Sequence, residues 1–148
     1  MNKERYNFTT EANLMKFTFQ STGLKGKVKK AVEFTPIGVN GLKVYNLGFG
    51  DLNDATGKFD DLSVSNNGDR DKILATVAAT VLDFTRNVSG ALIYAEGSTP
   101  TRTRLYQMAL MANLEDISKV LEVYGLVKDE WRPFEKNVNY EAFMALRK

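Results

Sequence analysis

Residues Gly90–Met111, GALIYAEGSTPTRTRLYQMALM, contain a strand, a glycine turn and the start of a helix. The apolar run Ala91–Ala95 is typical of a short strand that lies centrally in a sheet and is covered on both faces. Thr99 and Pro100 fit the N-cap and first position of the helix, because a threonine hydroxyl accepts from a backbone N–H and proline has no N–H to leave unpaired. The chain is therefore predicted to pass from sheet to helix here.

The predicted helix after Pro100 carries charged and aromatic side chains in its first two turns. Arg102 and Tyr106 are four residues apart and share one face, whereas Arg104 points elsewhere. We expect the stripe that faces the core to consist of Leu105, Met108, Ala109 and Ala112.

A second long helix is predicted upstream of the strand, with Asp69 as its N-cap. Its apolar side chains recur at i, i+4, i+8 and i+11, which is the spacing of one buried helix face. They are Ile73, Val77, Val81 and Phe84, and the stripe is widened by Leu74 and Ala78.

The remaining segments predict strands and turns. Asn40-Gly41 between apolar runs is a strong hairpin signal, because a type I′ turn needs positive φ at both central positions. A second turn is expected at residues 53–57. The strands of this antiparallel half are predicted at Leu14–Gln20, Val28–Ile37, Leu42–Gly50 and Phe59–Val64. Two late strands are predicted at Val120–Gly125 and Trp131–Val138, and a strand or short helix at Tyr140–Arg147.

These elements predict one α+β domain over residues 1–148, with a twisted, mostly antiparallel sheet and two main helices. The chain contains no cysteine and no histidine, which excludes disulfides, thiolate metal sites and the commonest general base. Its net charge of +2 is close to zero and indicates neither a nucleic-acid partner nor a membrane partner. No run approaches the roughly 20 apolar residues of a membrane span, so we expect a cytoplasmic protein.

The turn before the helix at Pro100 is the first candidate site. A helix start leaves backbone N–H groups without intrahelical acceptors and carries partial positive charge. Hydroxyl and guanidinium groups gathered there suit a phosphate or carboxylate. The candidate ligand-binding residues are Gly97, Ser98, Thr99, Arg102 and Arg104. The alternative is structural: a capped helix whose Arg102 pairs with Glu96 or Glu122.

Three further segments hold charged groups for which structural roles compete with functional ones. The loop Ser65–Lys72 opens a helix and contains a glycine, but its aspartates disfavour an anion. The basic run Lys25–Lys30 lies near Phe17 and Phe19, as in some single-stranded nucleic-acid sites, yet alternation turns both rings inward and leaves the lysines as a solvated surface. No metal is predicted, because calcium-loop spacing is missing among the carboxylates Asp51, Asp54, Asp60 and Asp61.

The order of elements from about Phe17 resembles the GNAT-type N-acetyltransferase fold without its two early helices. In that family the helix after the fourth strand holds the coenzyme A pyrophosphate, which the resemblance places at Ile73–Phe84. The helix after the next strand often carries a tyrosine that protonates the leaving thiolate. Because Arg102–Tyr106 looks like that segment, the resemblance implies Tyr106 as the catalytic acid and acetyl-CoA as the cofactor.

The chain is also similar to small single-domain families of unknown function in Bacteroidota. Their pattern is a glycine-serine-threonine turn followed by R-x-R-L-Y and, near the C-terminus, N-x-x-Y-x-x-F. Gly97–Thr99, Arg102–Tyr106 and Asn137–Phe143 fit it. This resemblance implies a bacterial protein and carries no assigned activity.

Two functions follow as hypotheses. The first is a non-catalytic binding or regulatory module without a cofactor, whose cleft at Gly97–Tyr106 recognises an anionic small molecule or a protein partner. The alternative is an acyl-CoA-dependent N-acyltransferase with Tyr106 as general acid. A nucleic-acid partner ranks below both, since the near-neutral chain lacks a broad basic patch. An exposed strand edge would support a homodimer.

Overall fold

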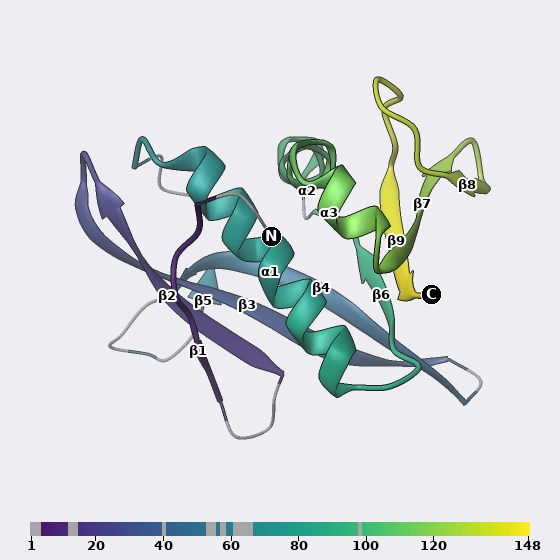
Figure 1. The fold of residues 1–148 in the computed structure, drawn as a ribbon, viewed down its shortest axis with the longest axis horizontal. Coiled ribbons are helices and arrows are strands. Elements are labelled where there is room, and N and C mark those ends of the chain that lie inside the picture. The colour runs from purple at the N-terminus through teal and green to yellow at the C-terminus, as the bar shows by residue number, and fades with distance from the viewer. Residues whose placement is uncertain are drawn as a thin grey trace.

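The computed structural model describes residues 4–11, 15–39, 41–52, 56, 59–60, 67–97 and 99–148, without the side chains of residues 39, 59 and 60. Within these residues the chain forms one nine-stranded sheet and three helices (Figure 1). In chain order the elements are β1 (Thr9–Thr10), β2 (Lys16–Gly23), β3 (Gly26–Val39), β4 (Leu42–Leu52), β5 (Phe59–Asp60), α1 (Arg70–Asn87), β6 (Leu92–Ala95), α2 (Pro100–Ala112), α3 (Leu114–Ser118), β7 (Leu121–Val127), β8 (Glu130–Pro133) and β9 (Ala142–Arg147).

The strands lie in the order β1-β2-β3-β4-β6-β9-β7-β8, and β5 also pairs with β4. Neighbouring strands are antiparallel except β4 and β6, which run parallel where residues 44–46 face residues 92–94. The predicted α+β class with a mostly antiparallel sheet is confirmed. β6 is the central strand that its apolar sequence predicted, since it lies between β4 and β9.

β3 and β4 form the long hairpin predicted from Asn40-Gly41. Gly41 has a φ of +77°, a left-handed conformation that glycine adopts without steric penalty, and Val39 pairs with Leu42. Asn40 itself lies outside the described residues. So do residues 53–55, 57–58 and 61–66, which include most of the second predicted turn and the end of the strand predicted at Phe59–Val64.

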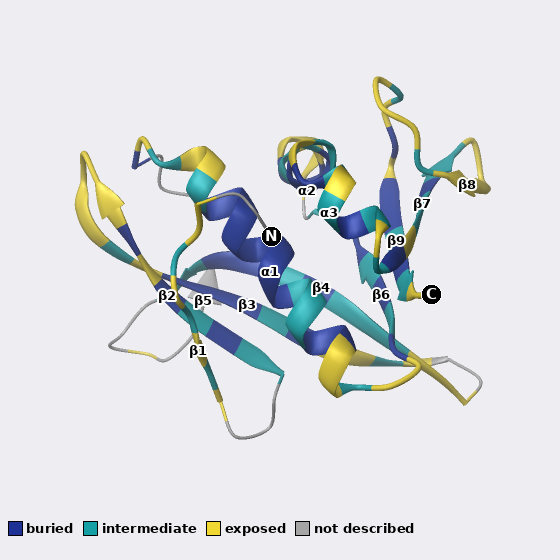
Figure 2. Cartoon of the chain, viewed as in Figure 1, coloured by how far each residue is buried: buried dark blue, intermediate teal, exposed yellow. Residues whose placement is uncertain are grey.

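The helices cover one face of the sheet, and the buried side chains gather between the two layers (Figure 2). α1 buries its predicted stripe except Val81, which is half-buried; Phe84 is fully buried and Ile73 almost so. The ring of Phe84 stacks on Phe34 of β3 at a centroid distance of 4.1 Å. Phe17 and Phe19 of β2 point into the same core, as alternation predicted. Burying each such ring contributes about 1.5 to 3 kcal/mol.

A polar cluster joins the start of α1 to the β2–β3 hairpin. Asn67 is 1% exposed, and its side chain donates to Ser21 Oγ at 3.0 Å and accepts from Lys25 N. Asp69 holds the predicted N-cap position of α1, but its side chain makes no capping bond. Its carboxylate accepts from the hydroxyls of Tyr6 and Ser21 instead. We call Tyr6, Ser21, Asn67 and Asp69 the hairpin clamp, because they tie the helix start to the sheet.

α2 turns a different side to the core than its apolar pattern predicted. Of the predicted stripe only Ala109 is buried, while Leu105 and Met108 are half-buried and Ala112 is exposed. The buried residues of α2 are Arg102, Thr103, Tyr106, Gln107 and Ala109. The prediction was wrong because polar side chains that find hydrogen-bond partners inside a fold can be buried at little cost.

The C-terminal part corrects several predicted bounds. The strand predicted at Trp131–Val138 ends at Pro133, and Tyr140–Arg147 contains a strand, β9, rather than a helix. α3 and β1 were not predicted, because elements of five and two residues are too short to show a periodic pattern. In the described part of the chain, no helix has the length and apolar content needed to cross a membrane.

Lys30 departs from the solvated surface predicted for the run Lys25–Lys30. Its side chain is fully buried, with Nζ 2.5 Å from Asp51 Oδ1 and 5.9 Å from the centroid of the Phe49 ring. Alternation along β3 explains this position, because Lys30 lies on the same side of the strand as the core residue Phe34. The ion pair with Asp51 offsets the cost of removing the ammonium group from water.

Candidate functional site

Side chains of α2 shape the turn that leads from β6 into the helix. Thr99 caps α2 as predicted, since its Oγ1 accepts from Arg102 N at 3.2 Å. Thr103 Oγ1 accepts from Gly97 N at 3.0 Å and donates to Thr99 O at 3.3 Å. A Cβ added to Gly97 would lie 2.3 Å from Thr103 N. Glycine is therefore required here, because the strand end and the helix start approach each other closely.

The segment 138–141 lies opposite this turn and is held by Gln107. This side chain is 8% exposed; its Nε2 donates to Val138 O at 2.6 Å and its Oε1 accepts from Tyr140 N at 3.2 Å. The Tyr140 ring lies against Gly125 of β7, where an added Cβ would be 2.3 Å from the ring. The segment is therefore fixed to both α2 and the sheet.

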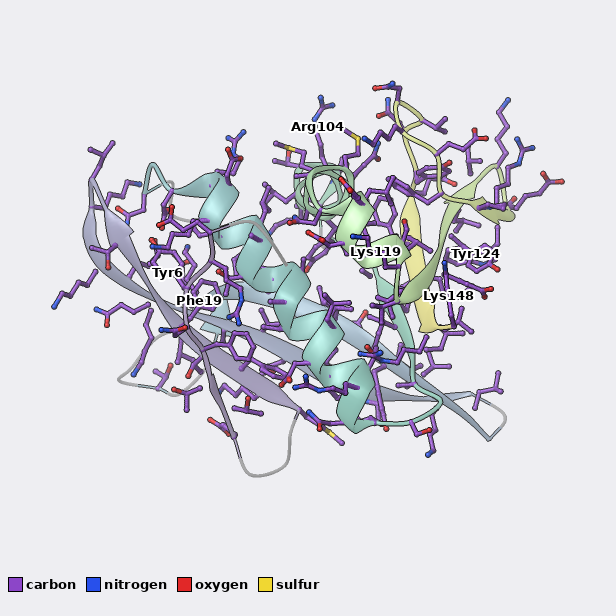
Figure 3. All side chains as sticks on the ribbon, in the orientation of Figure 1. Tyr6, Phe19, Arg104, Lys119, Tyr124 and Lys148 are labelled. Carbon is purple, nitrogen blue, oxygen red and sulfur yellow. The ribbon has the colours of Figure 1, made fainter. Side chains whose placement is uncertain are left out.

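An open groove of about 640 Å³ lies between the turn and this segment. Its lining includes Gly97, Thr99, Thr101, Arg104, Asn139 and Glu141. We call this space the α2 groove. Figure 3 shows Arg104 projecting from α2 into open space on the side away from the sheet.

The α2 groove carries charges of both signs. Arg104 supplies a guanidinium group, whereas Glu96 and Glu141 supply carboxylates. The start of α2 adds partial positive charge, and the N–H of Thr101 lies in the first turn, where backbone donors have no intrahelical acceptor. An anionic group therefore fits near Arg104 and Thr101, with acceptors for neighbouring donors close by.

The structure separates the predicted site residues into two groups. Gly97, Thr99 and Arg104 line the α2 groove, and Ser98 lies outside the described residues. Arg102 and Tyr106 are only 6% and 9% exposed. The face that these two residues share, as their spacing predicted, is turned to the interior.

Tyr106 lines a smaller space, an apolar cavity of about 60 Å³ between the helices and the sheet. The parallel pairing of β4 and β6 ends at Asn46 and Tyr94, although β4 continues to Leu52. Leu47 and Ala95, which follow the last paired residues, both line the cavity. The cavity therefore lies where the two strands part, and its apolar walls offer nothing to a charged group.

Tyr94 connects the central strand to the α2 groove. Its hydroxyl donates to Glu96 Oε1 at 2.8 Å. Burial, together with the hydrogen bond and the negative charge of Glu96, raises the pKa of Tyr94 to about 12. At neutral pH the phenol is therefore protonated and holds the carboxylate of Glu96 at the edge of the groove.

In the second candidate segment, Ser65–Lys72, the side chains of Asn67 and Asp69 form hydrogen bonds within the hairpin clamp. Residues 65 and 66 lie outside the described part. The surface hollow at the start of α1 is lined by Asp69 and Asp71 as well as by Arg70 and Lys72, so it has no excess of positive charge for an anion.

The predicted group of four carboxylates is only partly described. Asp51 pairs with Lys30, Asp54 and Asp61 lie outside the described residues, and the side chain of Asp60 is not described. Among the residues that the structure describes, no three side chains of the histidine, cysteine, aspartate or glutamate type are grouped to hold a metal ion.

Sequence reasoning missed Gln107, Asn139 and Glu141 as parts of the site. Thr103 and Gln107 are four residues apart, so two polar side chains on one face of α2 were a usable signal. No local sequence pattern indicated that Asn139 and Glu141 belong to the site. Their segment lies more than 30 residues after Gln107 in the chain and reaches α2 only in the folded structure.

Comparisons with known proteins give a family but no function. Neither the curated proteins nor the solved structures contain a significant match to this chain. A family of unknown function, DUF6934, matches residues 2–148. This confirms the predicted kind of family, while an origin in Bacteroidota stays a prediction. Over practically its whole length, the chain belongs to the DUF6934 family.

Proposed function

We propose that this protein is a non-catalytic binding module whose α2 groove takes a small anionic ligand or an anionic group of a protein partner. The observation that carries the proposal is the construction of the groove from two distant segments, which the buried side chains of Thr103 and Gln107 hold in place. A largely preformed cleft with a few convergent polar groups is the usual form of a small-molecule site. We also propose that the protein acts in the cytoplasm of a bacterium.

The charges of the groove narrow the class of ligand. Arg104 and the start of α2 favour a carboxylate or phosphate, through charge-assisted hydrogen bonds. Glu96 and Glu141 repel a polyanion and favour hydrogen-bond donors beside the anionic group. The proposed ligand therefore carries one anionic group next to amino, amide or hydroxyl groups.

Thermal unfolding with a panel of amino acids, hydroxy acids and phosphate monoesters tests this proposal. A ligand that binds only the native state stabilises it by about 2.7 kcal/mol at 100 times its Kd, which raises Tm. We expect Arg104→Gln to abolish the rise and Arg86→Gln, at an exposed arginine in the last turn of α1, to preserve it. A rise that survives Arg104→Gln contradicts the groove as the site. The absence of any rise contradicts the small-ligand form of the proposal.

An acyl-CoA-dependent N-acyltransferase is the second candidate, with Tyr106 as general acid. The order of elements favours it, and so does the apolar cavity, which Tyr106 lines where β4 and β6 part. The aspartates at the start of α1 count against a pyrophosphate there. Saturating acetyl-CoA should raise Tm, and Tyr106→Phe should lower acyl transfer about 100-fold or more. No rise in Tm with acetyl-CoA rules this candidate out.

A further inference from the structure

The β2–β3 hairpin extends beyond the other strands of the sheet. β1 pairs with β2 only at Phe17 and Thr18, and β4 pairs with β3 no further than Lys30. Among the described strands, residues 20–29 therefore pair only with each other. We call residues 20–29 the ribbon. Figure 1 shows its turn at the upper left, away from the other strands.

An apolar side chain occupies the turn of the ribbon. Only two residues, Leu24 and Lys25, connect the paired residues Gly23 and Gly26. Two-residue hairpin turns usually consist of glycine, asparagine or aspartate. Leu24 has none of the properties that favour these residues, yet it is 91% exposed, more than any other described side chain among the exposed large hydrophobic ones.

The hairpin clamp fixes the backbone of this turn through Asn67. The backbone carbonyl of Asn67 accepts from Leu24 N at 3.1 Å, and its side-chain Oδ1 accepts from Lys25 N. The side-chain Nδ2 of Asn67 donates to Gly26 O at 2.9 Å. A Cβ added to Gly23 would lie 1.9 Å from Asn67 O, so the two segments are in close contact. The folded chain therefore presents Leu24 to solvent on a backbone that is held in place.

Lysines follow Leu24 along the ribbon. Lys25, Lys27 and Lys29 are exposed and recur at every second residue, which corresponds to about 6.8 Å of strand. The sequence contains no aspartate or glutamate between residues 20 and 32. The ribbon is therefore locally basic, although the net charge of the whole chain is only +2.

The described charges beside the ribbon do not cancel those of its lysines. Three acidic and three basic side chains lie at the start of α1 and in the segment next to it, so this region is close to neutral. They are Glu4, Asp69 and Asp71, and Arg5, Arg70 and Lys72. The positive charge of the ribbon is thus an excess over its described surroundings.

We propose that the ribbon attaches the protein to a membrane surface that contains anionic lipids. Leu24 enters the boundary between headgroups and acyl chains, where the apolar face of an interfacial segment lies about 5 to 10 Å deep. Lys25 and Lys27, which follow it along the ribbon, then lie at the level of the anionic headgroups. One apolar residue and a few lysines give a weak and reversible attachment, because even a single myristoyl chain binds only marginally.

The order of the groups along the ribbon favours a lipid surface over a nucleic acid. A phosphate backbone is bound by cations at the point of contact, and binding of physiological strength uses many of them. In the ribbon the outermost side chain, Leu24, is apolar, and only a few lysines stand behind it. This arrangement suits a surface that has an apolar interior beneath a charged layer.

Co-sedimentation of the full chain with lipid vesicles tests this proposal, without any ligand of the α2 groove. We expect binding to phosphatidylcholine vesicles that contain phosphatidylserine, weakening as salt is added, and none to phosphatidylcholine alone. Leu24→Ser should lower the partition coefficient about tenfold or more, because the apolar contact is lost. Lys25→Glu combined with Lys27→Glu should do the same.

The matched controls make the same changes elsewhere. Leu42→Ser removes an exposed leucine, 64% accessible, from the β3–β4 hairpin at the other end of β3. Lys119→Glu combined with Lys136→Glu changes the net charge equally at two other exposed lysines. Both controls should keep at least half of the wild-type binding. Far-ultraviolet circular dichroism checks that each variant is folded.

A fluorescent label locates the contact. Because the chain contains no cysteine, Thr22→Cys beside the turn and Leu42→Cys each accept one environment-sensitive fluorophore. The emission of the label at residue 22 should shift to the blue on phosphatidylserine vesicles, and that of the label at residue 42 should not. The proposal is wrong if the wild-type chain binds neither kind of vesicle, even when it binds duplex DNA, or binds both kinds equally. It is also wrong if Leu24→Ser binds as the wild type does or if only the label at residue 42 shifts.

Discussion

At Gly97 the strand end, the turn and the helix start crowd around one α-carbon. A Cβ there would lie 2.3 Å from Thr103 N and 2.3 Å from Arg102 Cβ, and neither atom is the flexible end of a side chain. We predict that Gly97→Ala lowers the free energy of unfolding by about 1 to 3 kcal/mol, the usual cost of overpacking. Urea denaturation monitored by circular dichroism measures this change.

Gly38→Ala in β3 is the matched control for Gly97→Ala, because nothing lies within 4 Å of a Cβ built at that position. Its free energy of unfolding should stay within about 0.5 kcal/mol of the wild-type value. Equal losses in the two variants would show that the close approach of Gly97 to α2 is not the cause.

The phenol of Tyr94 gives a second prediction at this scale. Its pKa of about 12 should appear in an absorbance titration as one of the six tyrosines that ionises late. Glu96→Gln should lower this pKa, because the carboxylate is removed, but leave it above the ordinary value, because burial remains the largest cause. A titration in which all the tyrosines ionise together near 10 would contradict this environment for Tyr94.

The sign of this shift fixes its effect on stability. The folded chain binds the Tyr94 proton more tightly than the unfolded chain, since its pKa is raised from about 10 to about 12. The protonated Tyr94 therefore stabilises the folded chain fully below pH 10, and this stabilisation is lost as the pH rises through about 12. The partly exposed position of Tyr94 keeps this contribution small.

The hairpin clamp determines how α1 begins. Asn67 makes three side-chain hydrogen bonds to the β2–β3 hairpin, with Lys25 N, Ser21 Oγ and Gly26 O as partners. We predict that Asn67→Ala lowers the free energy of unfolding by about 2 to 4 kcal/mol, since it leaves buried groups without partners. Chemical denaturation gives this value.

Asn87→Ala is the control for the clamp. Its amide bonds to the Asp83 carbonyl at the exposed end of α1, so the loss should stay below about 0.5 kcal/mol. If Asn67→Ala costs no more than this control, the clamp does not hold the helix start and a local cap must do so.

Helix α2 shows where pattern reading succeeds and where it fails. Its start was predictable, because Thr99 and Pro100 carry local capping chemistry. Its buried face was not predictable, because Thr103 and Gln107 are buried where they form hydrogen bonds with Gly97 and Val138. Apolar periodicity detects only burial that is driven by the hydrophobic effect. Polar burial depends on partners that lie elsewhere in the chain.

For the molecule as a whole, the sequence predicted the order of the elements along the chain well. It predicted less well which strands lie next to each other in the sheet. The β3–β4 hairpin has a local turn signal at Gly41, so both strands and their pairing were predicted. The insertion of β9 between β6 and β7 has none, since Leu92 and Leu146 meet across more than 50 residues. That insertion also completes the site, because the segment before β9 forms one side of the α2 groove.

The α2 groove as an anion site is the claim on which the proposed function depends. A two-dimensional ¹⁵N–¹H NMR titration with inorganic phosphate tests it most directly, because it reports each backbone amide separately. We predict saturable shifts of the Gly97, Thr101 and Arg104 amides that disappear in Arg104→Gln and persist in Arg86→Gln. Saturable shifts confined to the start of α1 at Arg70 and Asp71, or none at the groove in the wild-type protein, would contradict the claim.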